Sequence, residues 1–113
     1  MQQNTPQQAL TLSLLNARIT KAKAEFDTLI ADRRMDLKTR AERLEAVAKN
    51  LSGLKTLKLH YMTELRSIRY FRDALTTGIW QGEVIGERER ADLEAMIAQC
   101  EDNLRGIDGE VNS

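Results

Sequence analysis

The sequence predicts an all-α protein, an antiparallel helical bundle or coiled coil of three long helices. Ala, Leu, Glu, Lys, Arg and Gln dominate the 113 residues, while aromatic residues make up 4% and there is one Pro. Apolar residues recur at alternating spacings of three and four, which places them in a seam on one helix face. The length suits one domain covering residues 1–113.

The first predicted helix covers about residues 6–34. Thr5 can cap it, and Pro6 suits the first helical position, where no backbone N–H is needed. Its seam comprises Leu12, Leu15, Ile19, Ala22, Phe26 and Leu29. The seam is lost at Asp32, Arg33 and Arg34, where we expect the helix to end.

The second predicted helix covers residues 37–77 and has two candidate starts, with Asp36 or Thr39 as the cap. Two apolar seams follow: Leu37, Ala41, Leu44, Ala48 and Leu51, and then Leu54, Leu57, Tyr61, Leu65, Ile68, Phe71 and Leu75. Gly53 lies between them and costs about 1 kcal/mol within a helix. One continuous helix and a helix broken near Gly53 are therefore both open alternatives. Gly78 is expected to cap the end of this helix.

The third predicted helix covers residues 87–105, with a seam of Leu93, Ile97, Cys100 and Leu104. Gly106 suits a C-terminal cap, so residues 107–113 are expected to form a frayed tail. The Gly-rich segment 78–86 is predicted to be a connection, and the pattern leaves open whether it forms a short β-hairpin.

The charges are divided along the chain although the net charge is zero. Residues 1–75 hold 14 Lys and Arg against 8 Asp and Glu, whereas residues 76–113 hold 3 against 9. On helical wheels, the basic and acidic stripes lie on the same side of their seams, so they can meet between antiparallel helices. We therefore predict a structural charge clamp, within the chain or between two copies. It joins Lys55, Lys58, Arg66, Arg69 and Arg72 to Glu87, Glu94, Glu101 and Asp108.

The residues that catalysis needs are sparse. His60 is the single histidine and lies off the seam, while Cys100 lies on the seam and has the pattern of a buried structural thiol. No Cys or His spacing suits a metal, and the glycines at 78, 82 and 86 lack a phosphate-loop ending. We therefore predict neither catalysis nor a cofactor or metal. With no long apolar run and no signal sequence, we also expect no membrane segment and a cytoplasmic location.

Protein–protein interaction is the predicted function class, as an adaptor, assembly factor, chaperone or inhibitor acting through helix faces. Leu59, Met62 and Tyr70 lie away from the seam of their helix, so they either pack centrally in the bundle or bind a partner. Trp80, in the Gly-rich connection, either plugs the end of the bundle or anchors an interface. We expect a homodimer, together with another protein as partner.

A nucleic-acid-binding accessory protein is the alternative. The segment between the first two helices carries a cluster of cations, here called the basic turn: Arg33, Arg34, Lys38, Arg40 and Arg43. Phosphates could contact this turn and the Lys55–Arg72 stripe. The basic turn is the more available of the two, because no acidic stripe is matched to it.

Overall fold

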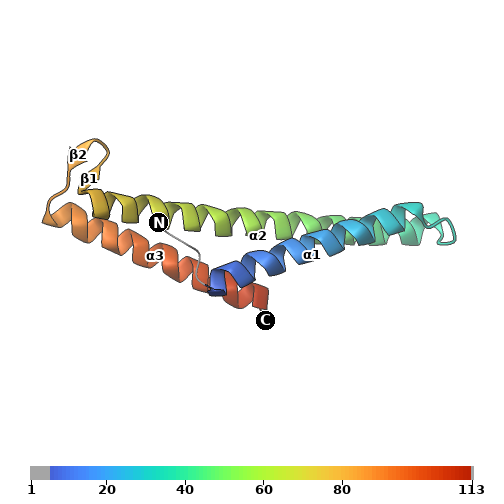
Figure 1. Cartoon of the computed structure of the whole chain (residues 1–113). Coiled ribbons are helices and arrows are strands. Elements are labelled where there is room, and N and C mark those ends of the chain that lie inside the picture. The colour runs from blue at the N-terminus through green and yellow to red at the C-terminus, as the bar shows by residue number, and fades with distance from the viewer. Residues whose placement is uncertain (1–5, 113) are drawn as a thin grey trace. The chain divides into compact units, whose positions relative to one another are not determined.

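The computed structural model describes residues 6–112 of the chain, with side chains from residue 8 onward. This part is 87% helical, which confirms the predicted all-α class. Its elements, drawn in Figure 1, are α1 (Pro6–Ala31), α2 (Leu37–Thr77), β1 (Ile79–Trp80), β2 (Glu83–Val84) and α3 (Glu87–Asn112). Thr5, the predicted first cap, lies outside the described residues.

The chain divides into two compact units that share α2. Among the described residues, the N-terminal unit comprises 6–59, with α1 and the first part of α2, while the C-terminal unit comprises 60–112. In the described part of the C-terminal unit, the second part of α2 leads through the two short strands into α3. Each unit is a helical hairpin in which the chain turns back along its own part of α2.

The core of the N-terminal unit confirms the predicted α1 seam. Ala22, Leu29 and Val47 are its buried centre, and five partly buried side chains pack against them: Phe26, Met35, Leu44, Leu51 and Leu54. All six seam residues of α1 are buried or half-buried. The α2 seam predicted to start at Leu37 is confirmed at Leu44 and Leu51 and is wrong at Leu37, Ala41 and Ala48, which are all exposed.

A single seam of α2 crosses Gly53. Val47, Tyr61 and Ile68 are buried on it, and half-buried side chains continue it at alternating spacings of three and four: Leu44, Leu51, Leu54, Lys58, Leu65, Arg72 and Leu75. The seam predicted from Leu54 onward shares this phase, and α2 runs unbroken from Leu37 to Thr77. Burial along a continuous face outweighs the roughly 1 kcal/mol that one glycine costs.

Asp36 begins α2, and the alternative start at Thr39 is wrong. The Thr39 backbone N–H donates to Asp36 Oδ1 at 2.9 Å, and the Thr39 hydroxyl donates to Asp36 Oδ2 at 2.7 Å. These hydrogen bonds hold the pKa of the Asp36 carboxyl below its usual value. On the other side of the turn, Arg40 donates to the backbone carbonyl of Asp32 at 2.8 Å, just past the end of α1. Local side chains thus form hydrogen bonds with backbone groups at both ends of the turn.

In the C-terminal unit, α3 is longer than the sequence predicted. The seam of Leu93, Ile97, Cys100 and Leu104 is buried as expected. The helix then continues to Asn112, so Gly106 is no cap and residues 107–112 are not a frayed tail. The reason is visible in the spacing: Val111 lies seven residues after Leu104 and is completely buried. Burial of Val111 favours continuation of the helix through Gly106 and Gly109.

The connection between α2 and α3 contains a β-hairpin, the alternative that the sequence left open. Gly78, with φ of 75°, ends α2 as predicted, and its N–H bonds to the Ala74 carbonyl at 2.9 Å. Ile79 then pairs with Val84, and Trp80 with Glu83. Gln81 and Gly82 form the turn, and both have positive φ, as a type I′ turn requires.

Candidate partner-binding surfaces

The hairpin in the C-terminal unit exposes large apolar side chains. The Val84 side chain is 84% exposed, and those of Ile79 and Tyr70 are each 52% exposed. Ile79 and Val84 are cross-strand partners, so their side chains share one face of the hairpin, while Trp80 and Glu83 share the other. Two-residue strands have no second sheet to cover them, which leaves the apolar pair open to solvent.

Trp80 borders two shallow hollows in this unit, here together called the Trp80 site. One hollow, of about 220 Å³, lies between the hairpin and α2, where Tyr70, Asp73 and Thr77 line it. The other, of about 260 Å³, extends toward the first turn of α3 and is lined by Glu83, Val84, Ile85 and Glu89. The ring of Trp80 therefore contributes to a concave, partly aromatic surface.

The polar groups of the Trp80 site are acidic. Asp73, Glu83 and Glu89 are its charged lining residues, and no Lys or Arg lines either hollow. Among the side chains described, these three carboxylates form no ion pair. The indole Nε1 of Trp80 is buried and has no acceptor in the described chain. An unpaired buried donor costs about 1–3 kcal/mol, and the indole N–H of Trp80 lacks the hydrogen bond that would offset this cost.

The predicted partner face of α2 is exposed. Leu59 is 64% and Met62 42% exposed, and both lie on the same helix face as Tyr70. Of the two alternatives for this face, central packing in the bundle is therefore wrong. Leu59 belongs to the N-terminal unit and Met62 to the C-terminal unit, but both lie on the one helix that the units share.

The structure divides the basic turn into two groups. Arg34 lies 3.6 Å from Asp32 as an ion pair, and Arg40 donates its hydrogen bond to the Asp32 carbonyl. Arg33, Lys38 and Arg43 are exposed, and none of them forms an ion pair with a described residue. A hollow of about 430 Å³ lies beside this turn, lined by Ile30, Arg33, Met35, Asp36, Leu37 and Arg40. Three of the five predicted cations thus remain available to an external anion.

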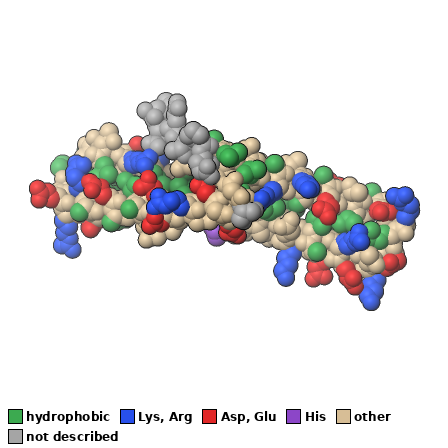
Figure 2. Space-filling model, turned by 90° about the horizontal axis from the view of Figure 1, so that it is seen from below, with side chains coloured by type: hydrophobic (Ala, Val, Ile, Leu, Met, Phe, Trp, Pro, Cys, Tyr) green, Lys and Arg blue, Asp and Glu red, His purple; other side chains and the backbone are tan. Residues whose placement is uncertain are grey.

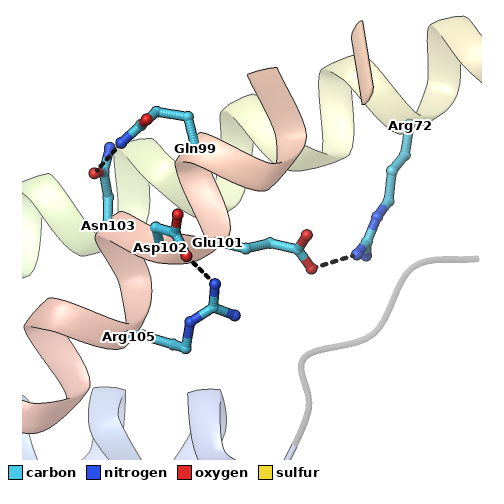
Figure 3. Close-up of polar contacts among 6 residues, drawn as sticks. All are labelled: Arg72, Gln99, Glu101, Asp102, Asn103 and Arg105. Atoms are coloured by element: carbon cyan, nitrogen blue, oxygen red, sulfur yellow. Dashed lines mark hydrogen bonds and ion pairs between the residues drawn. The ribbon is translucent and has the colours of Figure 1, made fainter. Parts of the chain in front are cut away.

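One pair from the predicted charge stripes is in contact. Arg72 of α2 reaches Glu101 of α3, with 3.2 Å between Arg72 Nη2 and Glu101 Oε2 (Figure 3). Both side chains are about two-fifths exposed, at 40% and 42%, so solvent screens the pair. Arg66 and Arg69 are exposed and pair with no acidic residue of the described chain. On the same part of α2, Glu64 accepts a hydrogen bond from Asn103 of α3 at 3.1 Å.

The Glu64 contact also involves Cys100, a buried free thiol on α3. Burial is the largest cause that raises the pKa of Cys100, followed by a hydrogen bond with Glu64 and the negative charges of Glu64 and Glu101, and together they bring it to about 11. A thiol with so high a pKa is protonated at neutral pH and is a poor nucleophile. No sequence pattern indicates Glu64, because its contact with Cys100 depends on the register between α2 and α3.

The remaining surface is mixed in character. Figure 2 shows basic, acidic and hydrophobic side chains interspersed over one face of the molecule. His60, the single histidine, is exposed. No three His, Cys, Asp or Glu side chains among the described residues are placed to hold a metal ion. Between residues 6 and 112, no helix is both long and apolar enough to cross a membrane.

Sequence reasoning identified Trp80 but missed the three carboxylates around it. Asp73 lies on α2, Glu83 on β2 and Glu89 in the first turn of α3. A hairpin pattern at Gln81-Gly82 was the one available signal, because a tight turn there would bring Glu83 opposite Trp80. No family model, curated protein or solved structure matches this chain.

Proposed function

We propose that this chain is a non-enzymatic protein–protein interaction protein, of the adaptor, assembly factor, chaperone or inhibitor type. The exposed apolar side chains around Trp80 support this most directly, since Val84, Ile79 and Tyr70 lie beside two hollows. Aromatic and aliphatic anchors at a concave site are typical of protein interfaces. The free, buried and protonated Cys100 is in keeping with a reducing compartment, and we place the protein in the cytoplasm.

Affinity capture from the source organism tests this function. The variant Ile79→Ser/Val84→Ser removes the apolar pair of the hairpin without touching either core. The matched control is Ile30→Ser/Leu37→Ser, which removes two exposed apolar side chains of the N-terminal unit. We expect a partner protein that the wild type and the control retain, and that the hairpin variant retains at least about tenfold less. Equal recovery by all three proteins would contradict a partner site at the hairpin.

Self-association is part of the same proposal. Leu59, Met62 and Tyr70 form an exposed strip on α2, and large apolar side chains on a helix face are commonly covered by a second helix. We propose that two copies pair along this strip as a homodimer. Tyr70 belongs to both surfaces, so the strip adjoins the Trp80 site on α2.

Nucleic-acid binding is the second candidate, and the exposure of Arg33, Lys38 and Arg43 favours it. The test is titration of duplex and single-stranded DNA at low and physiological salt. Three phosphate contacts would give a slope of about −3 for log affinity against log salt on duplex DNA. Arg33→Glu/Arg43→Glu should abolish such binding, while Arg88→Glu/Arg90→Glu serves as a charge-matched control. Absence of salt-dependent binding would remove this candidate.

A further inference from the structure

The lining of the Trp80 site defines what chemistry can occupy it. Trp80 and Tyr70 offer aromatic surface, and Asp73, Glu83 and Glu89 offer carboxylates that no cation of the described chain neutralises. A cation over an indole face is attracted by the ring, and Trp is the best of the aromatic residues for this contact. Carboxylates that line the same hollows as the ring add charge-assisted hydrogen bonds. The site is therefore complementary to a cationic group.

Among cationic side chains, arginine fits this lining better than lysine. The planar guanidinium stacks on an aromatic ring and still directs its N–H groups at carboxylates, whereas the ammonium of lysine is a compact, strongly hydrated charge. The exposed pair Ile79 and Val84 lies on the opposite face of the same hairpin, and each of the two also lines one of the hollows. An arginine flanked by apolar residues could use both surfaces at once.

The occupant is also expected to carry a hydrogen-bond acceptor. Trp80 Nε1 is enclosed and has no acceptor in the described chain. A peptide backbone brings carbonyl groups next to its side chains, and a carbonyl is the acceptor that the indole N–H lacks. A free cation or a small amine lacks this group.

We propose that the Trp80 site binds an arginine-containing, partly apolar segment of another protein. This inference rests on the proposed protein-binding function and names the chemistry of its partner. A second copy of this chain is a poorer occupant, although its basic turn carries exposed arginine. That turn also carries Asp32 and Asp36, whose carboxylates would face Asp73, Glu83 and Glu89.

Trp80 is the single tryptophan, so its fluorescence reports on the site directly. The probes are three capped pentapeptides, Ala-Leu-X-Leu-Ala, in which X is arginine, lysine or citrulline, the neutral isostere of arginine. We expect the arginine peptide to shift Trp80 emission and to bind at least about tenfold more tightly than the citrulline peptide. Asp73→Asn/Glu89→Gln should remove that preference, while the control Asp92→Asn, an exposed carboxylate of α3 outside both hollows, should retain it. Circular dichroism establishes that each variant keeps its helical content.

Several results would overturn the inference. Equal binding of the arginine and citrulline peptides would reject arginine recognition, yet leave an apolar protein-binding surface that the capture experiment tests by itself. An arginine preference that persists in Asp73→Asn/Glu89→Gln would place the binding elsewhere. No emission change with any peptide at millimolar concentration would also reject it. A dimer that dissociates in Asp73→Asn/Glu89→Gln would identify a second copy as the occupant instead.

Discussion

At the residue scale, the environment of Cys100 shows how a seam position can control reactivity. The thiol is buried on α3, and Glu64 reaches it from α2. Both effects favour the protonated form, and burial is the larger. The residue therefore contributes packing, and its chemistry is suppressed by its neighbours.

Replacement of Glu64 by Gln should make Cys100 more reactive. The pKa of the thiol is raised from 9.0 to about 11, so its thiolate fraction at neutral pH is about 100-fold lower than usual. Removing the Glu64 charge lowers that pKa, although burial still holds it above 9.0. Alkylation by iodoacetamide at pH 8 should therefore be faster in Glu64→Gln and unchanged in the control Glu94→Gln. An unchanged rate in Glu64→Gln would show that its charge does not reach the thiol.

Asp36 should make the stability of the fold depend on pH at acidic pH. Its folded pKa lies below 3.8, so its capping contribution is complete above 3.8 and is lost as pH falls through the folded pKa. Asp36→Ala should lower Tm at pH 7 by roughly 4–8 °C. The difference from wild type should shrink below pH 3.8, where the carboxyl becomes protonated. Asp27→Ala, in the exposed middle of α1, should show no such loss, and a Tm difference independent of pH would contradict the role of the carboxylate.

At the element scale, two glycines show different conformational requirements, one within α2 and one directly after its end. Gly53 lies within the helix, with no atom within 4 Å of where a Cβ would be. Gly78 has equally open space, but its φ of 75° is in the left-handed region. One position tolerates glycine, whereas the other requires it.

Substitution by alanine should therefore have opposite effects at these two positions. Gly53→Ala should raise the free energy of unfolding by about 0.5–1 kcal/mol, because alanine favours the helix. Gly78→Ala should lower it by about 1–2 kcal/mol, because a Cβ is strained at positive φ. Urea denaturation measures both, with each variant the control for the other. A destabilised Gly53→Ala would indicate that α2 bends at this residue.

The length of α3 is the second question at this scale. Val111 is completely buried at the end of a seam that extends past Gly106 and Gly109. Val111→Ala should lower the free energy of unfolding by about 2 kcal/mol, since it removes buried methyl groups. Asn112→Ala, which is exposed, should change it little. Equal stability of Val111→Ala and wild type would mean that the end of α3 is frayed.

At the scale of the whole molecule, charge and apolar exposure bear on association. The formal net charge is zero, although the first 75 residues carry an excess of six positive charges and the remainder an excess of six negative ones. The pair Arg72–Glu101 accounts for part of this division within the C-terminal unit. Arg66 and Arg69 remain exposed, so the predicted charge clamp stays a prediction for the other stripe residues.

The proposed homodimer should appear as a doubled mass. Sedimentation equilibrium should report twice the chain mass of 12.9 kDa, and Tm should rise with protein concentration. Leu59→Ser/Met62→Ser should shift the equilibrium toward monomer, because it removes the apolar strip of α2. Leu10→Ser, exposed on α1, is the control. A single-chain mass at all concentrations would exclude a stable dimer.

The sequence by itself determined the helices, most of their ends and the buried faces of α1 and α3. These features follow from local rules: Asp36 as a cap, Gly78 at positive φ, and apolar residues at spacings of three and four. It did not determine which residues join Leu44 and Leu51 in the first α2 seam, because Ala41 and Ala48 fit the three-and-four spacing although Val47 is the buried residue. The face that becomes buried depends on the helix that packs against it.

The Trp80 site and the Glu64–Cys100 contact were decided by tertiary structure alone. The carboxylates of Asp73, Glu83 and Glu89 come from three different elements, and only the folded hairpin places them around one indole ring. Glu64 and Cys100 are likewise brought together by the register of α2 against α3. Periodicity specifies which side of a helix faces inward, but the groups that meet there depend on side-chain packing between segments distant in sequence.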